Sequence, residues 1–259
     1  MDYRKEYEKW LASPALSEDE RAELRALEGN DKEIKARFYG PLEFGTAGLR
    51  GTMYTGLHNM NRHVIRWATQ GFANVIRAEG TEAMQKGIAV CMDCRNHSAE
   101  FARETACVMA ANGIHVRLFE SLRPTPELSF AVREYGCQAG VNVTASHNPK
   151  EYNGYKVYWA DGAQLPPQHA AAIADELTRI DIFTGVRSMD YEQALAEGRI
   201  ELLGEDCDRR FMANVMGMVN DYETVKKVAD DFGLVYTPFH GCGYKLVPEA
   251  LTRLGIKHL

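Results

Sequence analysis

The sequence lacks the long apolar segments that mark membrane and exported proteins. Its longest uninterrupted apolar run covers only residues 106–111, whereas a membrane-spanning helix needs roughly 20 such residues. No apolar stretch follows the polar start Met1-Asp2-Tyr3, so we predict no signal peptide. The six cysteines in 259 residues are too few for a disulfide scaffold and fit a reducing compartment. We therefore expect a cytoplasmic protein without a membrane partner.

Basic residues are also scarce. The chain has 30 Lys and Arg against 36 Asp and Glu, which gives a formal net charge of −6. A nucleic-acid binder needs a basic face to neutralise phosphates and none is evident, so we expect no nucleic-acid partner. Hydrophobic residues make up 45% of the chain and charged residues 25%, as in soluble globular proteins. At roughly 150 residues per domain, this length predicts one or two domains.

The middle of the chain alternates between short apolar runs and helical patterns. The runs at 88–91, 114–119 and 139–144 predict strands, and the segments 98–112 and 125–136 predict helices between them. Parallel strands need such crossover helices. The pattern therefore predicts an α/β fold with a mostly parallel mixed sheet sandwiched by helices.

The two ends of the chain differ from this middle part. Residues 1–38 are charged and helical in pattern, and Ser17 and Glu20 have the spacing of a capping box. Residues 184–205 are polar and without clear periodicity, so we predict a first domain over 1–200 and a second over 201–259. A strand at 234–236 and a helix at 244–253 would begin that second, similar α/β domain. One strand and one helix cannot close a core, so we expect it to be truncated.

The most informative segment is 144–149, Thr-Ala-Ser-His-Asn-Pro, which directly follows the third predicted strand. Ligands of open α/β sheets bind beyond the carboxyl ends of the strands. Ser146 offers a nucleophilic oxygen, and His147 could move protons or hold an anion. Lys156 offers a cation or a general acid or base. A surface turn rich in capping side chains is the alternative interpretation.

A glycine-rich segment, 44–51, has matching chemistry. Its sequence is Phe-Gly-Thr-Ala-Gly-Leu-Arg-Gly, with glycines at a spacing of three. Their backbone N–H groups can approach an anion, and Arg50 can grip a phosphate with two hydrogen bonds. The segment matches neither the Walker A motif nor the dinucleotide fingerprint, and by itself it could be a tight turn.

Together the two segments resemble the α-D-phosphohexomutase superfamily. The resemblance extends to 123–126 (Arg-Pro-Thr-Pro), 154–158 (Gly-Tyr-Lys-Val-Tyr) and 235–241 (Val-Tyr-Thr-Pro-Phe-His-Gly), so it spans most of the chain. The charged N-terminal helices and the sequence of residues 152–158 are similar to those of the longer phosphoglucomutase branch, which includes phosphopentomutases. The resemblance implies the domain I fold of that superfamily.

The resemblance also implies an activity and residue roles. It implies an enzyme that interconverts glucose 1-phosphate and glucose 6-phosphate through a phosphoserine and a bound bisphosphate. Ser146 would carry the phosphoryl group, Arg50 would stabilise charge, and Lys156 would be a general acid or base. His147 and Asn148 would shape the serine loop and contact phosphate. A phosphosugar is thus the implied partner, and no oligomeric state is predicted.

Two cofactors are implied by the same resemblance. One Mg²⁺ would bridge the phosphate on Ser146 and an Asp-x-Asp-x-Asp-Arg loop, and glucose 1,6-bisphosphate would be an activator. No Asp-x-Asp-x-Asp occurs in the chain, and we interpret its nearest approach, 206–209 (Asp-Cys-Asp-Arg), as a solvated linker. Cys242 also departs from the small-residue loop that is common after the His-Gly pair. We therefore expect an N-terminal part of a mutase, inactive alone.

Three alternatives stay open. The enzyme could be a phosphomannomutase or phosphopentomutase of the same family, or the chain could be a non-catalytic phosphate-binding module. A serine hydrolase using Ser146 and His147 is weaker, because Gly-x-Ser-x-Gly is missing and adjacent side chains rarely face each other. The pair Cys91 and Cys94 has no second pair with which to bind zinc. Asp93 and Arg95 are expected to form a loop-fixing pair.

Overall fold

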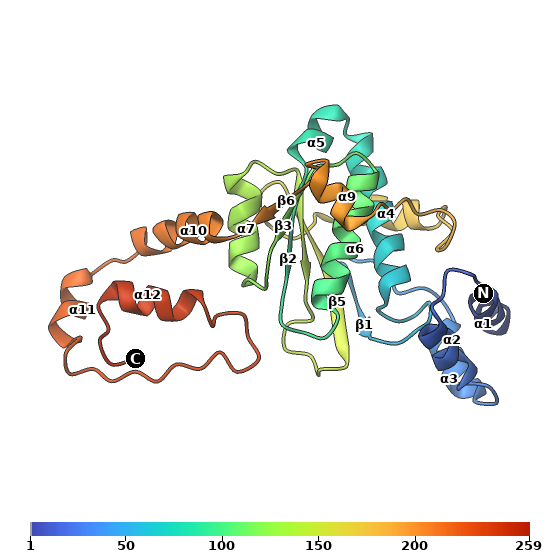
Figure 1. Ribbon diagram of the computed structural model, residues 1–259, viewed down its shortest axis with the longest axis horizontal. Helices are drawn as coiled ribbons and strands as arrows, with labels where there is room; N and C mark the ends of the chain where they lie inside the picture. The colour runs from blue at the N-terminus through green and yellow to red at the C-terminus, as the bar shows by residue number, and fades with distance from the viewer. Residues whose placement is uncertain (1) are drawn as a thin grey trace.

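A six-stranded mixed sheet forms the centre of the molecule in the computed structural model, which describes residues 2–259 (Figure 1). Its strand order is β1-β5-β4-β2-β3-β6. The strands are β1 (Leu49–Thr52), β2 (Ile88–Met92), β3 (Val116–Phe119), β4 (Ala139–Val143), β5 (Tyr152–Trp159) and β6 (Ile200–Leu203). Strands β4, β2, β3 and β6 run parallel, whereas β5 is antiparallel to both β4 and β1. The predicted α/β fold with a mostly parallel mixed sheet is confirmed.

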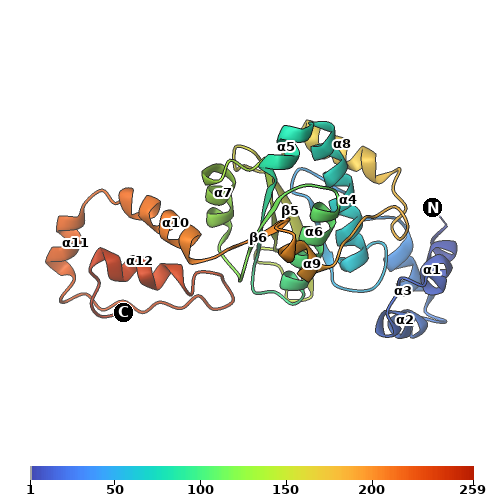
Figure 2. The same ribbon diagram turned by 45° about the horizontal axis from the view of Figure 1, so that its top comes forward.

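Helices cover both faces of this sheet (Figures 1 and 2). Those that belong to it are α4 (Arg62–Ala78), α5 (Thr81–Lys86), α6 (Ser98–Ala111), α7 (Thr125–Glu134), α8 (Pro167–Leu177) and α9 (Tyr191–Ala196). Helix α6 packs against β2, β3 and β4 and against α4, while α7 packs against β2 and β4. Gly140 permits the close approach of α7, because a Cβ there would lie 2.7 Å from the Val132 side chain. None of the helices within residues 2–259 is long and apolar enough to span a membrane.

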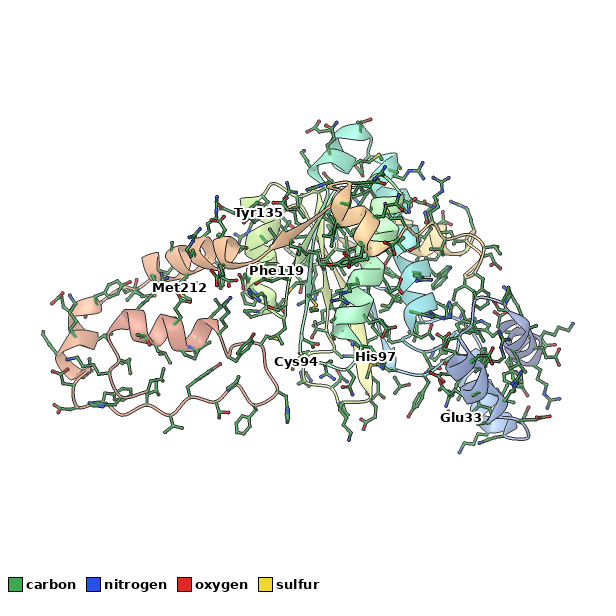
Figure 3. All side chains as sticks on the ribbon, in the orientation of Figure 1. Glu33, Cys94, His97, Phe119, Tyr135 and Met212 are labelled. Atoms are coloured by element: carbon green, nitrogen blue, oxygen red, sulfur yellow. The ribbon has the colours of Figure 1, made fainter. Side chains whose placement is uncertain are left out.

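The core lies between these layers. Val90, Val141 and Val157 are completely buried, and so is Phe119 on β3 (Figure 3). Tyr155 is buried as well, and its hydroxyl pairs with that of Thr69 on α4 at 3.0 Å. A buried hydroxyl with a partner avoids the penalty of an unsatisfied polar group. Apolar burial from three neighbouring strands thus fixes the sheet on which the site is built.

The strands at 88–91, 114–119 and 139–144 and the helices at 98–112 and 125–136 are confirmed as β2, β3, β4, α6 and α7. The structure adds β1 inside the glycine-rich segment, and α9 and β6 within 184–205. Strand β6 pairs with β3, which precedes it by more than 80 residues. It also lies across the predicted boundary between residues 200 and 201, and the division into two domains stays a prediction.

Three short helices precede the sheet: α1 (Tyr3–Ala12), α2 (Glu18–Arg25) and α3 (Asp31–Phe38). The capping box of Ser17 and Glu20 is confirmed at the start of α2. Trp10 and Phe38 are fully buried and stack edge-on, with ring centroids 5.7 Å apart. This apolar contact holds α1 and α3 together.

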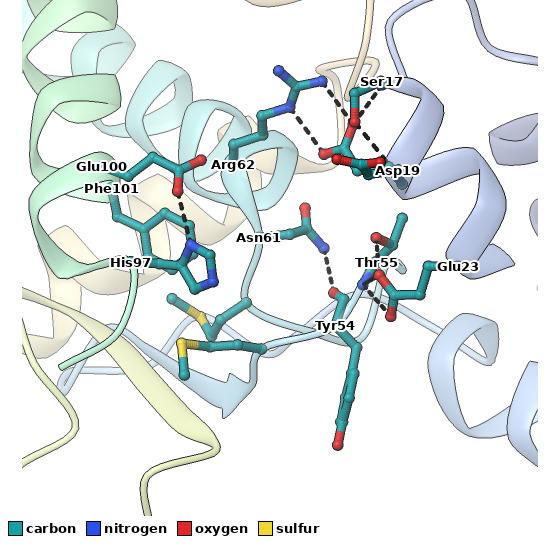
Figure 4. Close-up of a pocket in the computed structure, with 13 residues that line it drawn as sticks. Ser17, Asp19, Glu23, Tyr54, Thr55, Asn61, Arg62, His97, Glu100 and Phe101 are labelled. Carbon is teal, nitrogen blue, oxygen red and sulfur yellow. Dashed lines mark hydrogen bonds and ion pairs between the residues drawn. The ribbon is translucent and has the colours of Figure 1, made fainter.

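A pocket of about 330 Å³ lies where α2 meets the segment 53–62 and the start of α6 (Figure 4). Most of its charged groups already have partners. Glu23 accepts hydrogen bonds from the backbone N–H and hydroxyl of Thr55, and Glu20 pairs with Arg62 at 2.6 Å. These ion pairs and hydrogen bonds explain how the N-terminal helices dock.

The chain after β6 extends away from the sheet as α10 (Glu205–Gly217), α11 (Tyr222–Val228) and α12 (Leu246–Leu254) (Figures 1 and 2). The helix predicted at 244–253 is confirmed as α12. The strand predicted at 234–236 is wrong: in the described part of this region, only an isolated bridge joins Gly233 to His258. Val235 is 94% exposed, because no neighbouring strand pairs with it here.

The interpretation of 206–209 as a solvated linker is also wrong. These residues belong to α10, and the Asp208 side chain is only 5% exposed. Its carboxylate accepts two hydrogen bonds from the guanidinium of Arg123, at 2.6 and 3.0 Å. Arg123 is 1% exposed, so it needs a buried counterion, and Asp208 supplies it. Lys245 adds a second cation 2.6 Å from Asp208.

Candidate functional site

The serine segment lies at the carboxyl edge of the parallel strands. Strands β2 and β4 are neighbours, so the loops that follow them meet at this edge. Ser146 is exposed three residues after β4, with a φ of 58° in the left-handed region. Its backbone N–H donates to the Thr144 hydroxyl at 3.0 Å. Left-handed backbone in a serine is strained and clusters at functional sites.

Arg95 fixes the shape of the serine loop. Its guanidinium donates to four backbone carbonyls, those of Ser146 (2.8 Å), Asn148 (2.6 Å), Pro149 (2.9 Å) and Tyr152 (3.0 Å). The five N–H donors of a guanidinium lie in one rigid plane, which suits such a task. The loop therefore has one well-defined shape around Ser146.

Asp93 holds Arg95 in place, as expected of this pair. The two side chains are only 11% and 12% exposed, and their charged atoms lie 3.4 Å apart. Asp93 also accepts hydrogen bonds from the backbone N–H of Arg95 and the hydroxyl of Ser98. Buried Asn153 donates to the Ser98 hydroxyl from β5. The loop-fixing role predicted for Asp93 and Arg95 is confirmed.

The glycine segment contacts the serine loop through Arg50. Arg50 on β1 donates from Nη1 to the side-chain oxygen of Asn148 at 3.2 Å, across 98 residues of sequence. Gly48 has a φ of 78°, and a Cβ there would lie 1.8 Å from the Tyr155 carbonyl oxygen. Only glycine allows this approach. The segment therefore packs against β5 immediately beside Lys156.

Lys156 lies on the same face of the sheet as Arg50. Arg50 pairs with Gly154 across β1 and β5, and Lys156 is two residues further along β5. Residues two apart in a strand share a face. Within residues 2–259 the partly exposed Lys156 forms no ion pair. The structure thus links Ser146, His147, Asn148 and Arg50 in a chain of contacts, with Lys156 on the adjoining strand.

His147 turns toward its neighbour. Its Nδ1 lies 3.3 Å from the Ser146 hydroxyl oxygen, although adjacent side chains rarely face each other. A hydrolase triad needs a carboxylate that orients the histidine. In the part of the chain that the structure describes, no carboxylate pairs with His147. This arrangement lacks the third member of a triad and does not favour the hydrolase alternative.

A cavity of about 620 Å³ opens in front of Ser146. His147, Asn148 and Lys150 line one side, and the segment 239–241 lines the other. The thiol of Cys94, at this edge of the sheet (Figure 3), donates to the His240 carbonyl at 2.8 Å. A loop from the region after β6 therefore forms one wall of the cavity.

The described residues do not form the magnesium site that the family resemblance implies. Within residues 2–259, no group of three or more His, Cys, Asp or Glu side chains is placed to hold a metal ion. Mg²⁺ prefers several oxygen ligands in octahedral geometry. Of the predicted site residues, Ser146 would contribute to a metal site through its phosphate, and no step is assigned to the metal.

Comparison with known proteins identifies the family. The model of phosphoglucomutase/phosphomannomutase, alpha/beta/alpha domain I, matches residues 41–182. The chain belongs to the phosphoglucomutase/phosphomannomutase family. This family membership confirms the resemblance on which the sequence prediction rests.

Two curated relatives are phosphosugar mutases. A phosphoglucomutase from Staphylococcus saprophyticus is 32% identical over 224 residues, which cover 86% of this chain and 39% of that protein. A phosphopentomutase from Homo sapiens is 42% identical over 156 residues, which cover 58% of this chain and 26% of that protein. The chain therefore spans well under half the length of these relatives.

A solved structure shares the fold. The exocytosis-sensitive phosphoprotein pp63/parafusin from Paramecium, a phosphoglucomutase in its open form, matches with a TM-score of 0.64 and 19% identity. The match covers 84% of this chain and 43% of that chain. At this identity the likeness supports the α/β architecture alone.

The sequence prediction and the structure differ in which residues position the site. The predicted residues Ser146, His147, Asn148 and Arg50 come together. The positioning contacts of Thr144 and Asn153 were not predicted, although both residues lie within or beside the motifs that carry the resemblance. The Thr144 contact is a local bond within the serine loop, whereas Asn153 on β5 donates to the Asn96 carbonyl after β2, a contact across 57 residues that the motifs alone do not reveal.

Proposed function

We propose that the protein carrying this chain is a phosphosugar mutase in which Ser146 carries the phosphoryl group. The observation that supports this most is the 3.2 Å hydrogen bond between Arg50 and Asn148. It brings a guanidinium from the glycine segment to the loop of the exposed serine. Guanidinium groups bind phosphate oxygens with paired hydrogen bonds.

The reaction would have two halves. A hydroxyl of the sugar phosphate attacks the phosphorus on Ser146, the bond from phosphorus to the serine oxygen breaks, and a sugar bisphosphate forms. The other phosphoryl group of that intermediate then returns to Ser146, which releases the isomeric monophosphate. Each half forms one oxygen–phosphorus bond and breaks another, so no further reactant is consumed.

The side chains around Ser146 suit this transfer. Phosphoryl transfer depends on positioning and on neutralising charge on the phosphoryl oxygens. Arg50 would neutralise that charge, and Lys156 would take the proton of the attacking hydroxyl and return it to the leaving oxygen. His147 and Asn148 would contact the phosphate, and Arg95 would keep their loop in place. Mg²⁺ and glucose 1,6-bisphosphate stay predictions.

Two sugar phosphates are candidates. Glucose 1-phosphate is the first, because the staphylococcal phosphoglucomutase matches 86% of the chain. A pentose 1-phosphate is the second, because the human phosphopentomutase is more similar, at 42% identity, over a shorter part of the chain. Both sugars therefore belong in the assay.

The test is Ser146→Ala in the protein that carries this chain, assayed with glucose 1-phosphate and ribose 1-phosphate. We expect turnover of the preferred sugar to fall to background, because no other group would accept the phosphoryl. Ser188→Ala, at an exposed serine outside the site, should keep wild-type turnover. Circular dichroism of both variants checks the fold.

Three outcomes would contradict the proposal. Substantial mutase activity in folded Ser146→Ala would remove this residue as the phosphoryl carrier. An equal loss of turnover in Ser188→Ala would mean that the loss does not depend on the Ser146 hydroxyl. Tight binding of both sugars by the wild-type protein, without turnover of either, would favour a phosphate-binding module.

A further inference from the structure

Two cysteines from distant parts of the sequence meet at the mouth of the candidate site. Cys94 follows β2 and is exposed, and Cys242 lies in the segment before α12 and is partly exposed. The Cys94 thiol donates to the carbonyl of His240, two residues before Cys242. The remaining cysteines, Cys91, Cys107, Cys137 and Cys207, are buried.

Cys242 lies beside the loop that carries Cys94, because it lines a cavity of about 210 Å³ together with Asp93, the residue before Cys94. The pKa of the Cys242 thiol is raised to about 11, mainly by burial and to a smaller extent by the charges of Asp93 and Cys94, whereas the backbone of Cys94 lowers it. Each cysteine thus lies beside the loop that carries the other.

We propose that Cys94 and Cys242 form a reversible disulfide when the protein meets a peroxide. Disulfides require Cα atoms within about 7 Å of each other. The hydrogen bond from Cys94 to the His240 carbonyl and the cavity that Cys242 shares with Asp93 bring the two loops together, as this requirement demands. Cytosolic disulfides are usually transient and redox-sensing.

Peroxide is the oxidant, and disulfide formation needs no other co-reactant. The exposed Cys94 thiolate attacks one peroxide oxygen, the O–O bond breaks, and a sulfenic acid and a hydroxide form. The Cys242 sulfur then attacks the Cys94 sulfur, the S–O bond breaks, and the oxygen leaves as water. Two thiols lose two electrons and two protons, and one peroxide becomes two waters. A dithiol reductant reverses the change.

The cross-link would join the two walls of the cavity. Cys94 is adjacent to Arg95, which holds the serine loop, and Cys242 follows the segment 239–241. A disulfide would pin that segment against the Ser146 loop and restrict the mouth of the cavity. This consequence for turnover rests on the proposed function, whereas formation of the disulfide does not.

The test is peptide mapping of the native protein after titration with hydrogen peroxide and alkylation of the remaining thiols. We expect a Cys94–Cys242 linked peptide that dithiothreitol removes, with the four buried cysteines unchanged. Cys94→Ser and Cys242→Ser should each abolish the link, and in Cys242→Ser the Cys94 sulfur should proceed to sulfinic acid. Cys137→Ser, at a buried cysteine, is the matched control and should still form the link.

Two results would overturn the inference. Sulfinic acid at Cys94 in the wild-type protein without any linked peptide would show that Cys242 does not reach it. A link to a different cysteine, or between two molecules, would show another pairing. If the link forms and the protein has no mutase activity, the proposed function fails and the disulfide stands. If it forms in an active mutase, peroxide should lower turnover in wild type and spare Cys242→Ser.

Discussion

The serine loop and the glycine segment meet where Arg50 donates to Asn148, but they are held in different ways. Arg95, itself paired with half-buried Asp93, donates to four backbone carbonyls in and beside the serine loop. The glycine segment is closed by reciprocal backbone hydrogen bonds between Gly45 and Gly48, and its one side-chain link to the serine loop is Arg50. Ser146, the proposed phosphoryl carrier, is thus held by the half-buried pair of Asp93 and Arg95, and the Arg50 cation is placed mainly by strand register.

This difference predicts that substitutions in the two regions affect different properties of the protein. Phosphoryl transfer depends on positioning and on neutralising charge on the phosphoryl oxygens, and in the proposed function the serine loop would supply the first and Arg50 the second. Changes in the glycine segment should therefore act on turnover, and changes beneath the serine loop should act on the fold.

The largest expected effect is that of Arg50→Ala on turnover. Loss of a cation that stabilises the transition state should lower kcat roughly 10²–10³-fold. The free energy of unfolding should stay within about 0.5 kcal/mol of wild type, since this side chain is exposed. Steady-state kinetics and urea unfolding measure the two. Unchanged kcat would remove Arg50 from the site.

Arg95→Ala, in contrast, should act mainly on the stability of the fold. It leaves Asp93 without its counterion and four carbonyls without their donor, so we expect a loss of about 3 kcal/mol in the free energy of unfolding. Arg209→Ala, at a side chain that is 70% exposed, is the control and should cost under about 0.5 kcal/mol. Equal stability of the two variants would mean that the serine loop holds its shape without Arg95.

Gly48→Ala tests the close approach of the glycine segment to β5. The added methyl group would collide with the Tyr155 carbonyl, and the positive φ adds strain, so we expect a loss of roughly 1–3 kcal/mol. Gly45→Ala is the matched control, because a Cβ there meets nothing within 4 Å. Thermal unfolding of both compares them directly. A stable Gly48→Ala would show that the segment does not pack as described.

Thr144→Val should have the smallest effect. It removes the acceptor of the Ser146 backbone N–H, which is worth about 1 kcal/mol in the free energy of unfolding. Thr144→Ser keeps the hydroxyl and should be close to wild type. If serine and valine at this position are equally destabilised, packing of the methyl group matters and the hydrogen bond does not.

Local patterns in the sequence predict much of the sheet. The apolar run at 88–91 and the capping residues around 125 predict β2 and α7, because burial and capping act over a few residues. Strand β6 was missed because Ile200–Leu203 is short and pairs with distant β3. The strand at 234–236 was predicted from its apolar residues alone, and a strand also needs a neighbour.

The site was predicted less from geometry than from resemblance. Ser146, His147 and Asn148 are adjacent in sequence, so their proximity was certain. Their contact with Arg50 depends on pairing between β1 and β5, and nothing local in the sequence predicts that pairing. The buried pair of Arg123 and Asp208 was missed for the same reason: a charged motif does not reveal a partner 85 residues away.

The most direct test of the central claim is to locate the phosphoryl group. The protein that carries this chain is incubated with glucose 1,6-bisphosphate, and its peptides are sequenced by tandem mass spectrometry. We predict one phosphoryl group, on Ser146, which disappears when excess glucose 1-phosphate is added and is absent from Ser146→Ala. A phosphoryl group on another residue, or none on Ser146 in a protein that turns over the sugar, would contradict the account.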